Sequence, residues 1–323
     1  MGMLEIQLTK ISTEPATALS LNDVPMPTPG LGEVRVQLLA RPINPADLLL
    51  IEGRHVFSPT LPCPVGIEGA GVVDAVGEGV VVPVGTRVAV PSGGTWRDYM
   101  IAPAADVIPL PEGLSMEQGA MLAVNPFTAA GLLQGLKSGD WFIINAATSS
   151  LAKIVLVLAK MRGLNGIAVV RSLRQQDELL HLGAKVVLLD GPELVEQAKQ
   201  LSSASICRGL DALSGEASGR LFQCLAPGGE LIIYGLMAAD QVVLPAALVV
   251  FSDIVVRGFS RLRSIQAMAP EERQAIAMEM LALVSMDLLP MAVEARYPLQ
   301  ETISALEHHL RPGRTGKIIL TSA

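Results

Sequence analysis

The chain has 323 residues, of which 50% are hydrophobic and 17% charged, and its formal net charge at pH 7 is −7. This length suits two globular domains or one large one, and the apolar content allows a large core. The acidic balance disfavours a nucleic-acid partner because phosphate binding needs a basic face. The longest apolar runs, Ile154–Ala159 and Val242–Phe251, fall short of the roughly 20 residues of a membrane span, so no membrane association is expected.

The segment Met1–Ser12 mixes charged and polar residues with apolar ones. It has neither the apolar core of a secretory signal nor the Arg-rich character of a transit peptide, so we expect a cytoplasmic protein. The three cysteines, Cys63, Cys207 and Cys224, show no Cys-x-x-Cys spacing. The sequence therefore predicts neither a disulfide framework nor a zinc motif.

The first 120 residues are predicted to be rich in β-strands. The runs Glu33–Leu39 and Gly71–Val76 alternate apolar and polar residues or are β-branched. Turn signals made of Pro and Gly separate such runs, at Pro29-Gly30, Gly77-Glu78-Gly79, Val84-Gly85 and Ser92-Gly93-Gly94. This pattern is typical of a small barrel or sandwich.

From about Ser115, strands alternate with helix-length segments, which is typical of parallel βαβ units. The predicted strands are Trp141–Asn145, Gly166–Val170, Lys185–Leu189, Glu230–Tyr234 and Asp253–Arg257, and the predicted helices are Leu151–Met161, Gln175–Leu182 and Pro270–Leu288. A last strand, Gly316–Leu320, returns to the β-rich pattern. The sequence thus predicts a doubly wound α/β domain over 123–266, inserted into a β-rich domain made of 1–122 and 267–323.

The segment Ile144–Ala152 is predicted to be a strand end, a tight turn and a helix start, where doubly wound folds bind a dinucleotide pyrophosphate. Glycines usually permit this turn, but the stretch 140–162 contains none, and Ser149, Ser150 and Ala152 stand in their place. These residues are small, and the serines can cap the helix. A dinucleotide site and an ordinary capped helix both stay open at this point.

The next predicted strand ends in Arg171-Ser-Leu-Arg174. An NAD enzyme usually places Asp or Glu near this position, on the ribose 2′-hydroxyl. Two guanidinium groups suit a 2′-phosphate instead, because arginine binds phosphate through paired hydrogen bonds. The sequence therefore predicts NADPH, the alternative being two solvated arginines at a helix start, where the helix dipole disfavours them.

Several motifs follow one another along the chain: Asn44-Pro45-Ala-Asp47, Gly66-Ile-Glu-Gly69-Ala-Gly71, Thr95-Trp96-Arg97, Val124-Asn125-Pro126-Phe-Thr128-Ala129, Tyr234-Gly235, Arg257-Gly258-Phe259 and Lys317. Together they resemble the zinc-free medium-chain dehydrogenases/reductases. The most similar group is the mitochondrial-type 2-enoyl thioester reductases, and the quinone reductases are a more distant match. The resemblance extends from about Leu21 to Leu320. It implies a Rossmann domain inserted into a GroES-like barrel domain.

The resemblance also implies a cofactor-binding set and the absence of a metal. The residues implied to bind NADPH are Asn44, Asn125, Thr128, Thr148, Ser149, Ser150, Leu151, Arg171, Ser172, Arg174, Tyr234, Gly235, Leu236, Met237, Phe259, Ser260 and Lys317. Zinc-dependent relatives carry Cys and His where this chain has Asn44 and Ile67, which are not effective zinc ligands. Without zinc, hydride addition to an already activated acceptor is the expected chemistry.

The proton donor is the least conventional part of the predicted site. Where the resembling enoyl reductases carry a Tyr after a Gln-Gly pair, this chain has Glu52-Gly53-Arg54-His55. His55 is the candidate general acid, because imidazolium donates protons well near neutral pH. It could equally be a loop residue, with water as the donor.

Three functions therefore stay open at the level of the sequence: reduction of a 2-enoyl thioester by NADPH, reduction of a quinone or enone by NADPH, and dinucleotide binding without catalysis. The apolar stretch Asp240–Phe251 is unusual for a surface connection, since large exposed apolar patches mark interfaces. In the resembling family two cofactor domains pair at a sheet edge, so a homodimer is expected.

Overall fold

The computed structural model describes residues 2–201 and 205–322. The chain divides into two compact units: unit 1 contains residues 1–124, 277–287 and 291–323, and unit 2 contains residues 125–276 and 288–290. The boundary expected near 122 lies beside the first division. The one expected near 266 precedes α11 (Pro270–Ser285), and the division runs through this helix.

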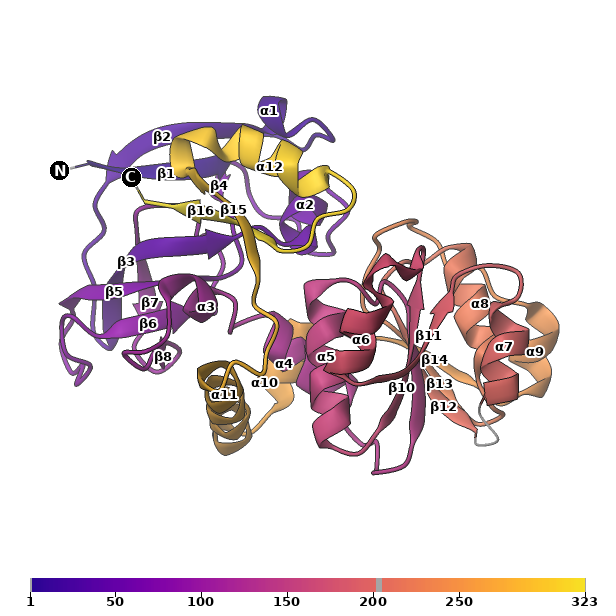
Figure 1. Cartoon of the computed structure of the whole chain (residues 1–323). Helices are drawn as coiled ribbons and strands as arrows, with labels where there is room; N and C mark the ends of the chain where they lie inside the picture. The colour runs from indigo at the N-terminus through magenta and orange to yellow at the C-terminus, as the bar shows by residue number, and fades with distance from the viewer. Residues whose placement is uncertain (1, 202–204, 323) are drawn as a thin grey trace. The chain divides into compact units, whose positions relative to one another are not determined.

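Unit 1 is built mainly of antiparallel strands (Figure 1). Its elements are β1 (Gly2–Leu8), α1 (Pro15–Ala18), β2 (Leu19–Pro25), β3 (Glu33–Pro42), α2 (Pro45–Ile51), β4 (Cys63–Pro64), β5 (Gly69–Val76), β6 (Arg87–Val90), β7 (Tyr99–Pro103), β8 (Ile108–Pro109), α3 (Met116–Ala120), β15 (Val293–Pro298), the 3₁₀-helix η2 (Leu299–Glu301), α12 (Thr302–Leu310) and β16 (Lys317–Thr321). A seven-stranded sheet has the order β15-β16-β3-β5-β6-β8, with β7 also paired to β3, and a three-stranded sheet has the order β2-β1-β4.

Strand β3 shows why the alternating pattern forms a sheet here. Val34, Val36 and Leu38 are fully buried and point to one face, where they join the core of the seven-stranded sheet. The predicted turn signals at Gly30 and Gly77 prove to touch each other, because a Cβ atom on Gly77 would lie 1.7 Å from the Gly30 carbonyl oxygen. Only glycine allows that approach.

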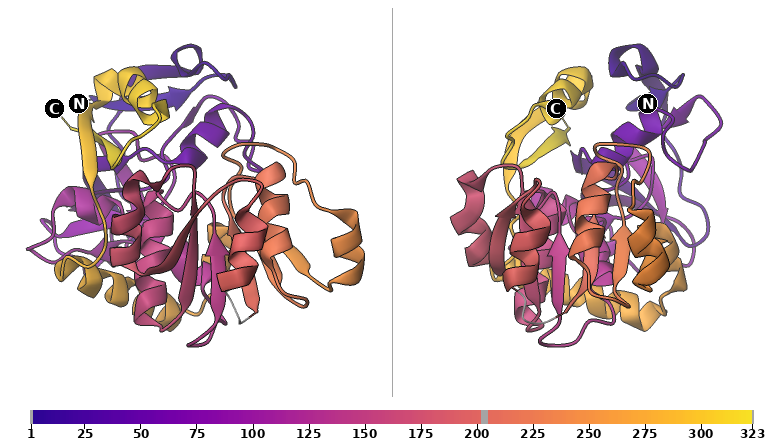
Figure 2. Two further views of the ribbon diagram at one scale, coloured as in Figure 1. Left: turned by 45° about the vertical axis from the view of Figure 1, so that its right-hand side comes forward. Right: turned by 90° about the vertical axis from the view of Figure 1, so that its right-hand side faces the viewer.

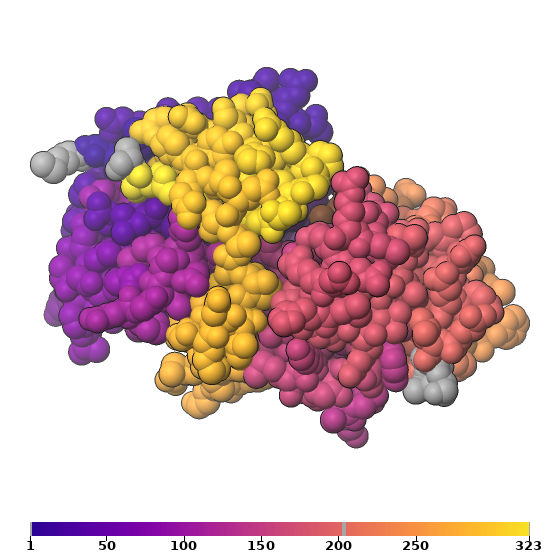
Figure 3. Space-filling model, in the orientation of Figure 1, coloured from indigo at the N-terminus to yellow at the C-terminus, as the bar shows by residue number. Residues whose placement is uncertain are grey.

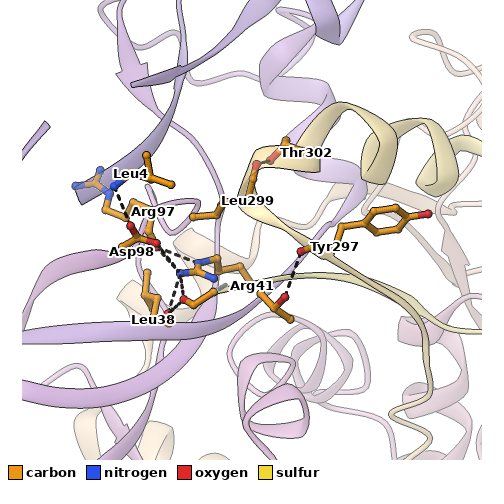
Figure 4. Close-up of polar contacts among 10 residues, drawn as sticks. Leu4, Leu38, Arg41, Arg97, Asp98, Tyr297, Leu299 and Thr302 are labelled. Atoms are coloured by element: carbon orange, nitrogen blue, oxygen red, sulfur yellow. Dashed lines mark hydrogen bonds and ion pairs between the residues drawn. The ribbon is translucent and has the colours of Figure 1, made fainter. Parts of the chain in front are cut away.

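The two ends of the chain meet in unit 1. Helix α12 packs beside α1 (Figure 1), and the yellow surface of the C-terminal residues borders the indigo surface of the N-terminal ones (Figure 3). Strand β16 pairs with β3. The buried Arg41 of β3 joins these segments: its guanidinium donates to the carbonyl oxygens of Arg97 (2.7 Å) and Leu38 (2.8 Å) and to the Ser322 hydroxyl (3.0 Å) (Figure 4). Burial lowers the pKa of Arg41 to about 10, against the raising effect of Asp98.

The buried His309 in α12 makes the stability of unit 1 depend on pH. Burial, followed by the charges of Arg314 and Lys317, lowers the pKa of His309 to about 3, below its ordinary value of 6.5. The folded state thus keeps His309 neutral while the unfolded chain takes up a proton below pH 6.5. This stabilising contribution is complete above pH 6.5 and is lost as pH falls toward 3, at about 1.4 kcal/mol for each pH unit.

The free energy of unfolding of the parent should fall between pH 6.5 and pH 5, and about 1.5 kcal/mol of that fall is due to His309. We therefore expect the fall in His309→Leu to be smaller by about 1.5 kcal/mol. Urea unfolding at the two pH values measures this difference. His181→Leu serves as the control, because His181 is exposed on α6 of unit 2. Identical pH slopes for the parent and His309→Leu would refute the assignment.

Unit 2 consists of a parallel sheet with helices on both faces (Figures 1 and 2). Its elements are α4 (Asn125–Leu132), β9 (Trp141–Ile144), α5 (Ser150–Met161), β10 (Asn165–Val170), the 3₁₀-helix η1 (Leu173–Gln175), α6 (Gln176–Leu182), β11 (Ala184–Leu189), α7 (Leu194–Leu201), β12 (Ile206–Asp211), α8 (Glu216–Cys224), β13 (Glu230–Ile233), α9 (Ala246–Phe251), β14 (Val255–Gly258) and α10 (Arg261–Ala267). The doubly wound fold predicted from the sequence is confirmed.

The strand order of this sheet is β11-β10-β9-β12-β13-β14. From β9 the chain continues through β10 to β11 on one side of the sheet, and from β12 it continues through β13 to β14 on the other side. The strand order therefore reverses between β9 and β12. Sheets of this kind bind ligands at the point of reversal. Helices α5 and α6 lie on one face, and α7, α8 and α9 lie on the other (Figure 1). Among the described residues, no helix is long and apolar enough to cross a membrane.

Candidate active site

The turn after β9 lies at the point where the strand order reverses. The chain leaves the strand through Ala146, whose φ of 46° lies in the left-handed region. Ser149 then caps α5, its hydroxyl accepting from the Ala152 backbone N–H at 3.2 Å. The first backbone N–H groups of a helix have no intrahelical partner, and they carry the positive end of its dipole. Thr148, Ser149, Ser150 and Leu151 therefore lie at a helix start that presents such N–H groups at this edge of the sheet, without glycine.

The arginine segment follows β10, the strand beside β9. Arg171, Ser172 and Arg174 are all exposed, and the Ser172 hydroxyl accepts from the Arg174 backbone N–H at 3.4 Å. Within residues 2–201 and 205–322, neither guanidinium group forms an ion pair. Both charges are thus available to an anion at the same carboxyl edge of the sheet as the turn after β9.

Two further predicted segments reach this edge. Tyr234, Gly235, Leu236 and Met237 follow β13, while Phe259 and Ser260 follow β14. The Tyr234 hydroxyl is buried and has no hydrogen-bond partner among the described residues. Burial, followed by the nearby Asp211 charge, raises the pKa of Tyr234, so the phenol stays protonated and can donate. A buried donor that lacks an acceptor suits a site that receives an oxygen-rich ligand.

Helix α4 carries Asn125 and Thr128, and Thr128 is buried. The helix packs against α5. Gly131, one turn further along, lies close to the Phe259 ring, where a Cβ atom would be 2.7 Å from Cζ. The structure therefore places Phe259, which follows β14, against helix α4 within unit 2.

A buried network at the same edge was not anticipated from the sequence. Asp211, at the end of β12, accepts from the Asn145 side-chain amide (2.6 Å) and from the backbone N–H groups of Leu213 (2.9 Å) and Ser214 (3.1 Å). The Asn145 side chain in turn accepts from the Ala212 N–H at 2.8 Å. This network fixes the carboxyl ends of β9 and β12 to each other. Asn145, directly after the apolar strand β9, was the available signal; β12, which ends in Asp211, has no continuous apolar run.

In unit 1 the structure joins Asn44 to Lys317. The Asn44 amide donates to Glu68 Oε1 at 2.9 Å and accepts a hydrogen bond from the Lys317 ammonium. Glu68 also accepts from the Val124 N–H at 2.9 Å. Asn44, Glu68 and Lys317 are all buried, so this cluster is desolvated. Burial lowers the pKa of Lys317, against the opposing charges of Glu68 and Asp47.

Asp47 closes the first turn of α2, where its carboxylate accepts from the Asn44 N–H at 2.8 Å. Burial raises the pKa of Asp47 to about 7; the Asn44 N–H opposes this shift and the Glu68 charge adds to it. Ile67, at the second position where zinc-dependent relatives have a ligand, is partly buried. No group of three or more His, Cys, Asp or Glu able to hold a metal occurs in the part of the chain that the structure describes.

His55 lies in unit 1, in the loop that follows α2. Its Nδ1 atom accepts from the Phe57 backbone N–H at 3.0 Å, so the neutral ring carries its proton on Nε2. The ring is partly buried, while the next two residues, Val56 and Phe57, are 90% and 62% exposed. In this tautomer the Nε2–H is the ring's hydrogen-bond donor.

The comparisons with known proteins cover nearly the whole chain. Residues 30–112 match the family described as alcohol dehydrogenase GroES-like domain, and residues 151–282 match zinc-binding dehydrogenase. The human protein named mitochondrial enoyl-[acyl-carrier-protein] reductase is 32% identical over 322 residues, which cover 95% of this chain and 86% of that protein.

Two solved structures show the same fold. A mutant form of enoyl thioester reductase from Candida tropicalis matches with a TM-score of 0.85 at 25% identity, covering 99% of this chain and 100% of that one. The Escherichia coli quinone oxidoreductase complexed with NADPH matches with a TM-score of 0.89 at 24% identity, covering 98% of this chain and 99% of that one.

Proposed function

Because the chain belongs to the medium-chain dehydrogenase/reductase family that includes the mitochondrial enoyl-[acyl-carrier-protein] reductases, we propose that it reduces the carbon–carbon double bond of a 2-enoyl thioester with NADPH. The family membership confirms the resemblance found in the sequence and makes the chain an oxidoreductase. The observation that carries the proposed substrate is the 32% identity to the human enoyl reductase over 95% of the chain.

NADPH would lie along the carboxyl edge of the sheet in unit 2 and supply the hydride. The turn Thr148–Leu151 would receive the pyrophosphate on backbone N–H groups. Arg171 and Arg174 would bind the 2′-phosphate, which is supported by their exposure and by the absence of ion pairs to other described residues. The unpartnered Tyr234 hydroxyl would donate to an oxygen of the cofactor.

The chain's own residues must then control the proton. Hydride addition at Cβ of an enoyl thioester leaves an enolate, which needs a proton at Cα. We assign that proton to the Nε2–H of the His55 imidazolium; in the imidazolium Nδ1 also carries a proton, so the hydrogen bond that Nδ1 accepts from the Phe57 N–H in the neutral ring is given up. The thioester already activates the double bond, so the reaction needs no zinc. Asn44 is bonded to Glu68 and Lys317, which supports a zinc-independent enzyme.

One observation favours a second substrate class. The loop that carries His55 exposes the apolar side chains of Val56 and Phe57, and a quinone needs no positioned acid, because its reduced oxygens take protons from water. Reduction of a quinone or enone by NADPH is therefore the alternative function.

Loss of NADPH absorbance with crotonyl thioester, 2-haloacrylate and naphthoquinone as separate acceptors tests the proposal. We expect the thioester to give the highest kcat/KM. A higher value for naphthoquinone would favour the alternative. Binding of NADPH without oxidation by any acceptor would indicate a non-catalytic dinucleotide-binding protein.

We further propose a homodimer built on the β14 edge of unit 2. Strand β14 ends the six-stranded sheet, and its residues are exposed. Helix α9 before it has no buried residue, and Val250 and Phe251 are 68% and 85% exposed. An open strand edge beside exposed apolar side chains invites a second copy of the chain.

Light scattering at micromolar concentration should then give twice the mass of the chain. Phe251→Asp should shift the distribution toward monomers, because it buries a carboxylate in the interface. Val81→Asp is the matched control, since Val81 is 93% exposed in unit 1. A monomeric parent protein would refute the dimer.

We also propose the cytoplasm as the compartment. Cys63, Cys207 and Cys224 are free thiols, which suits a reducing environment. The human relative is named mitochondrial, so fractionation of cells that express the tagged chain is the test, and recovery with mitochondria would contradict the proposal.

A further inference from the structure

Helix α5 buries a lysine in its first turns, where its neighbours are apolar. The Lys153 side chain is only 6% exposed, and Ala152 and Ile154 on either side are buried. A buried ammonium group needs a charged or hydrogen-bonding partner. Lys153 finds it on α6: its Nζ atom lies 2.6 Å from Glu178 Oε1.

Glu178 belongs to the segment that begins with the two arginines. It follows Arg174 by four residues, across the junction between the 3₁₀-helix η1 and α6. Its second carboxylate oxygen accepts from Gln175 at 2.9 Å, and its side chain is 43% exposed. Without Lys153, this carboxylate would be free to pair with Arg174, and its charge would repel a phosphate bound there.

We propose that Lys153 is a positioning residue for cofactor choice: by holding and neutralising Glu178, it keeps Arg174 available to the 2′-phosphate of NADPH. This inference rests on the proposed use of NADPH. Lys153 itself does not touch the phosphate. Its side chain forms an ion pair with Glu178. This ion pair links α5, the helix that follows the turn Thr148–Leu151, to the segment that carries Arg171 and Arg174.

The test compares dissociation constants for NADPH, NADH and 2′,5′-ADP, measured by nucleotide fluorescence and by calorimetry. Lys153→Met should weaken NADPH and 2′,5′-ADP about tenfold, the effect expected of one uncompensated charge near the phosphate, and change NADH by less than about twofold. Glu178→Gln should keep the affinity for NADPH or increase it. The double variant Lys153→Met/Glu178→Gln should return to within about twofold of the parent.

Lys160→Met is the matched control. Lys160 lies on the same helix and also contacts α6, donating to the His181 carbonyl at 3.0 Å, but it lies near the far end of α5. Its loss should leave the NADPH/NADH ratio unchanged. Lys153→Gln, which keeps a hydrogen-bond donor for Glu178 while removing the charge, should show the same selective loss as Lys153→Met and decides the question if the latter does not fold.

Equal weakening of NADPH and NADH in Lys153→Met, or no recovery in the double variant, would show that Lys153 only stabilises the fold and would overturn the inference. A parent protein that prefers NADH would instead refute the proposed cofactor. A parent that prefers NADPH, with variants that keep its preference, would refute only the role of Lys153.

Discussion

Replacing His55 by phenylalanine should lower the rate of enoyl-thioester reduction by about 10²–10⁴-fold, the range that a positioned general acid contributes. The reason is specific to this reaction, since the enolate carbon must receive a proton before the product can leave. In the neutral ring the His55 Nδ1 atom accepts from the Phe57 N–H, so the acid form of His55 has to exchange this hydrogen bond for a second ring proton. Reduction of naphthoquinone should change little.

A second variant separates an acid from a structural residue. His55→Tyr should retain activity with the thioester, because a phenol at this position can still donate a proton. His181→Phe is the control, because His181 is exposed in unit 2 and has no assigned role. If His55→Phe reduces the thioester as fast as the parent, water is the donor and the quinone or enone function becomes the better account.

Replacing Arg171 by alanine should weaken NADPH binding by about 1.5–3 kcal/mol, the range for a hydrogen bond to a charged group, or about 10–150-fold in Kd. Binding of NADH should stay nearly unchanged, because NADH lacks the 2′-phosphate. The exposed guanidinium of Arg171 pairs with no carboxylate in the described residues, so its removal leaves no buried charge behind. Arg174→Ala should act in the same direction.

Titration of both nucleotides by fluorescence measures these effects. Lys185→Ala, which removes an exposed cation from the neighbouring strand β11, tests whether general positive charge is sufficient. Losses of equal size for NADPH and NADH would mean that Arg171 supports the fold and not the phosphate. The selectivity should also decrease with salt, because the contact is between exposed charges.

The cofactor edge of unit 2 could be predicted from the sequence because of the way parallel sheets are built. Every strand enters the sheet in the same direction, so residues that follow β9, β10, β13 and β14 reach one edge. Strand ends can be found from apolar runs. These runs were sufficient to predict that the turn Thr148–Leu151 and the segments Arg171–Arg174 and Tyr234–Met237 lie at this edge. Strand β12 (Ile206–Asp211) was not anticipated, because Arg208 and Gly209 interrupt its apolar pattern.

Side-chain pairs between distant segments could not be predicted in this way. Asn44 and Lys317 are 273 positions apart and bond to each other only because β16 pairs with β3, where Ile319 faces Pro42. The resemblance implied a cofactor-binding role for both residues, and the structure shows them engaged in a buried polar cluster. The pairs Asn145–Asp211 and Lys153–Glu178 likewise depend on packing that no sequence spacing specifies.

The fate of the transferred hydrogen tests the central claim most directly. NADPH that carries deuterium at both C4 positions is mixed with the enzyme and crotonyl thioester in ordinary water, and the saturated product is analysed by mass spectrometry and NMR. The account predicts one deuterium at Cβ and a solvent hydrogen at Cα. Deuterium at Cα, or a product without deuterium, would contradict it.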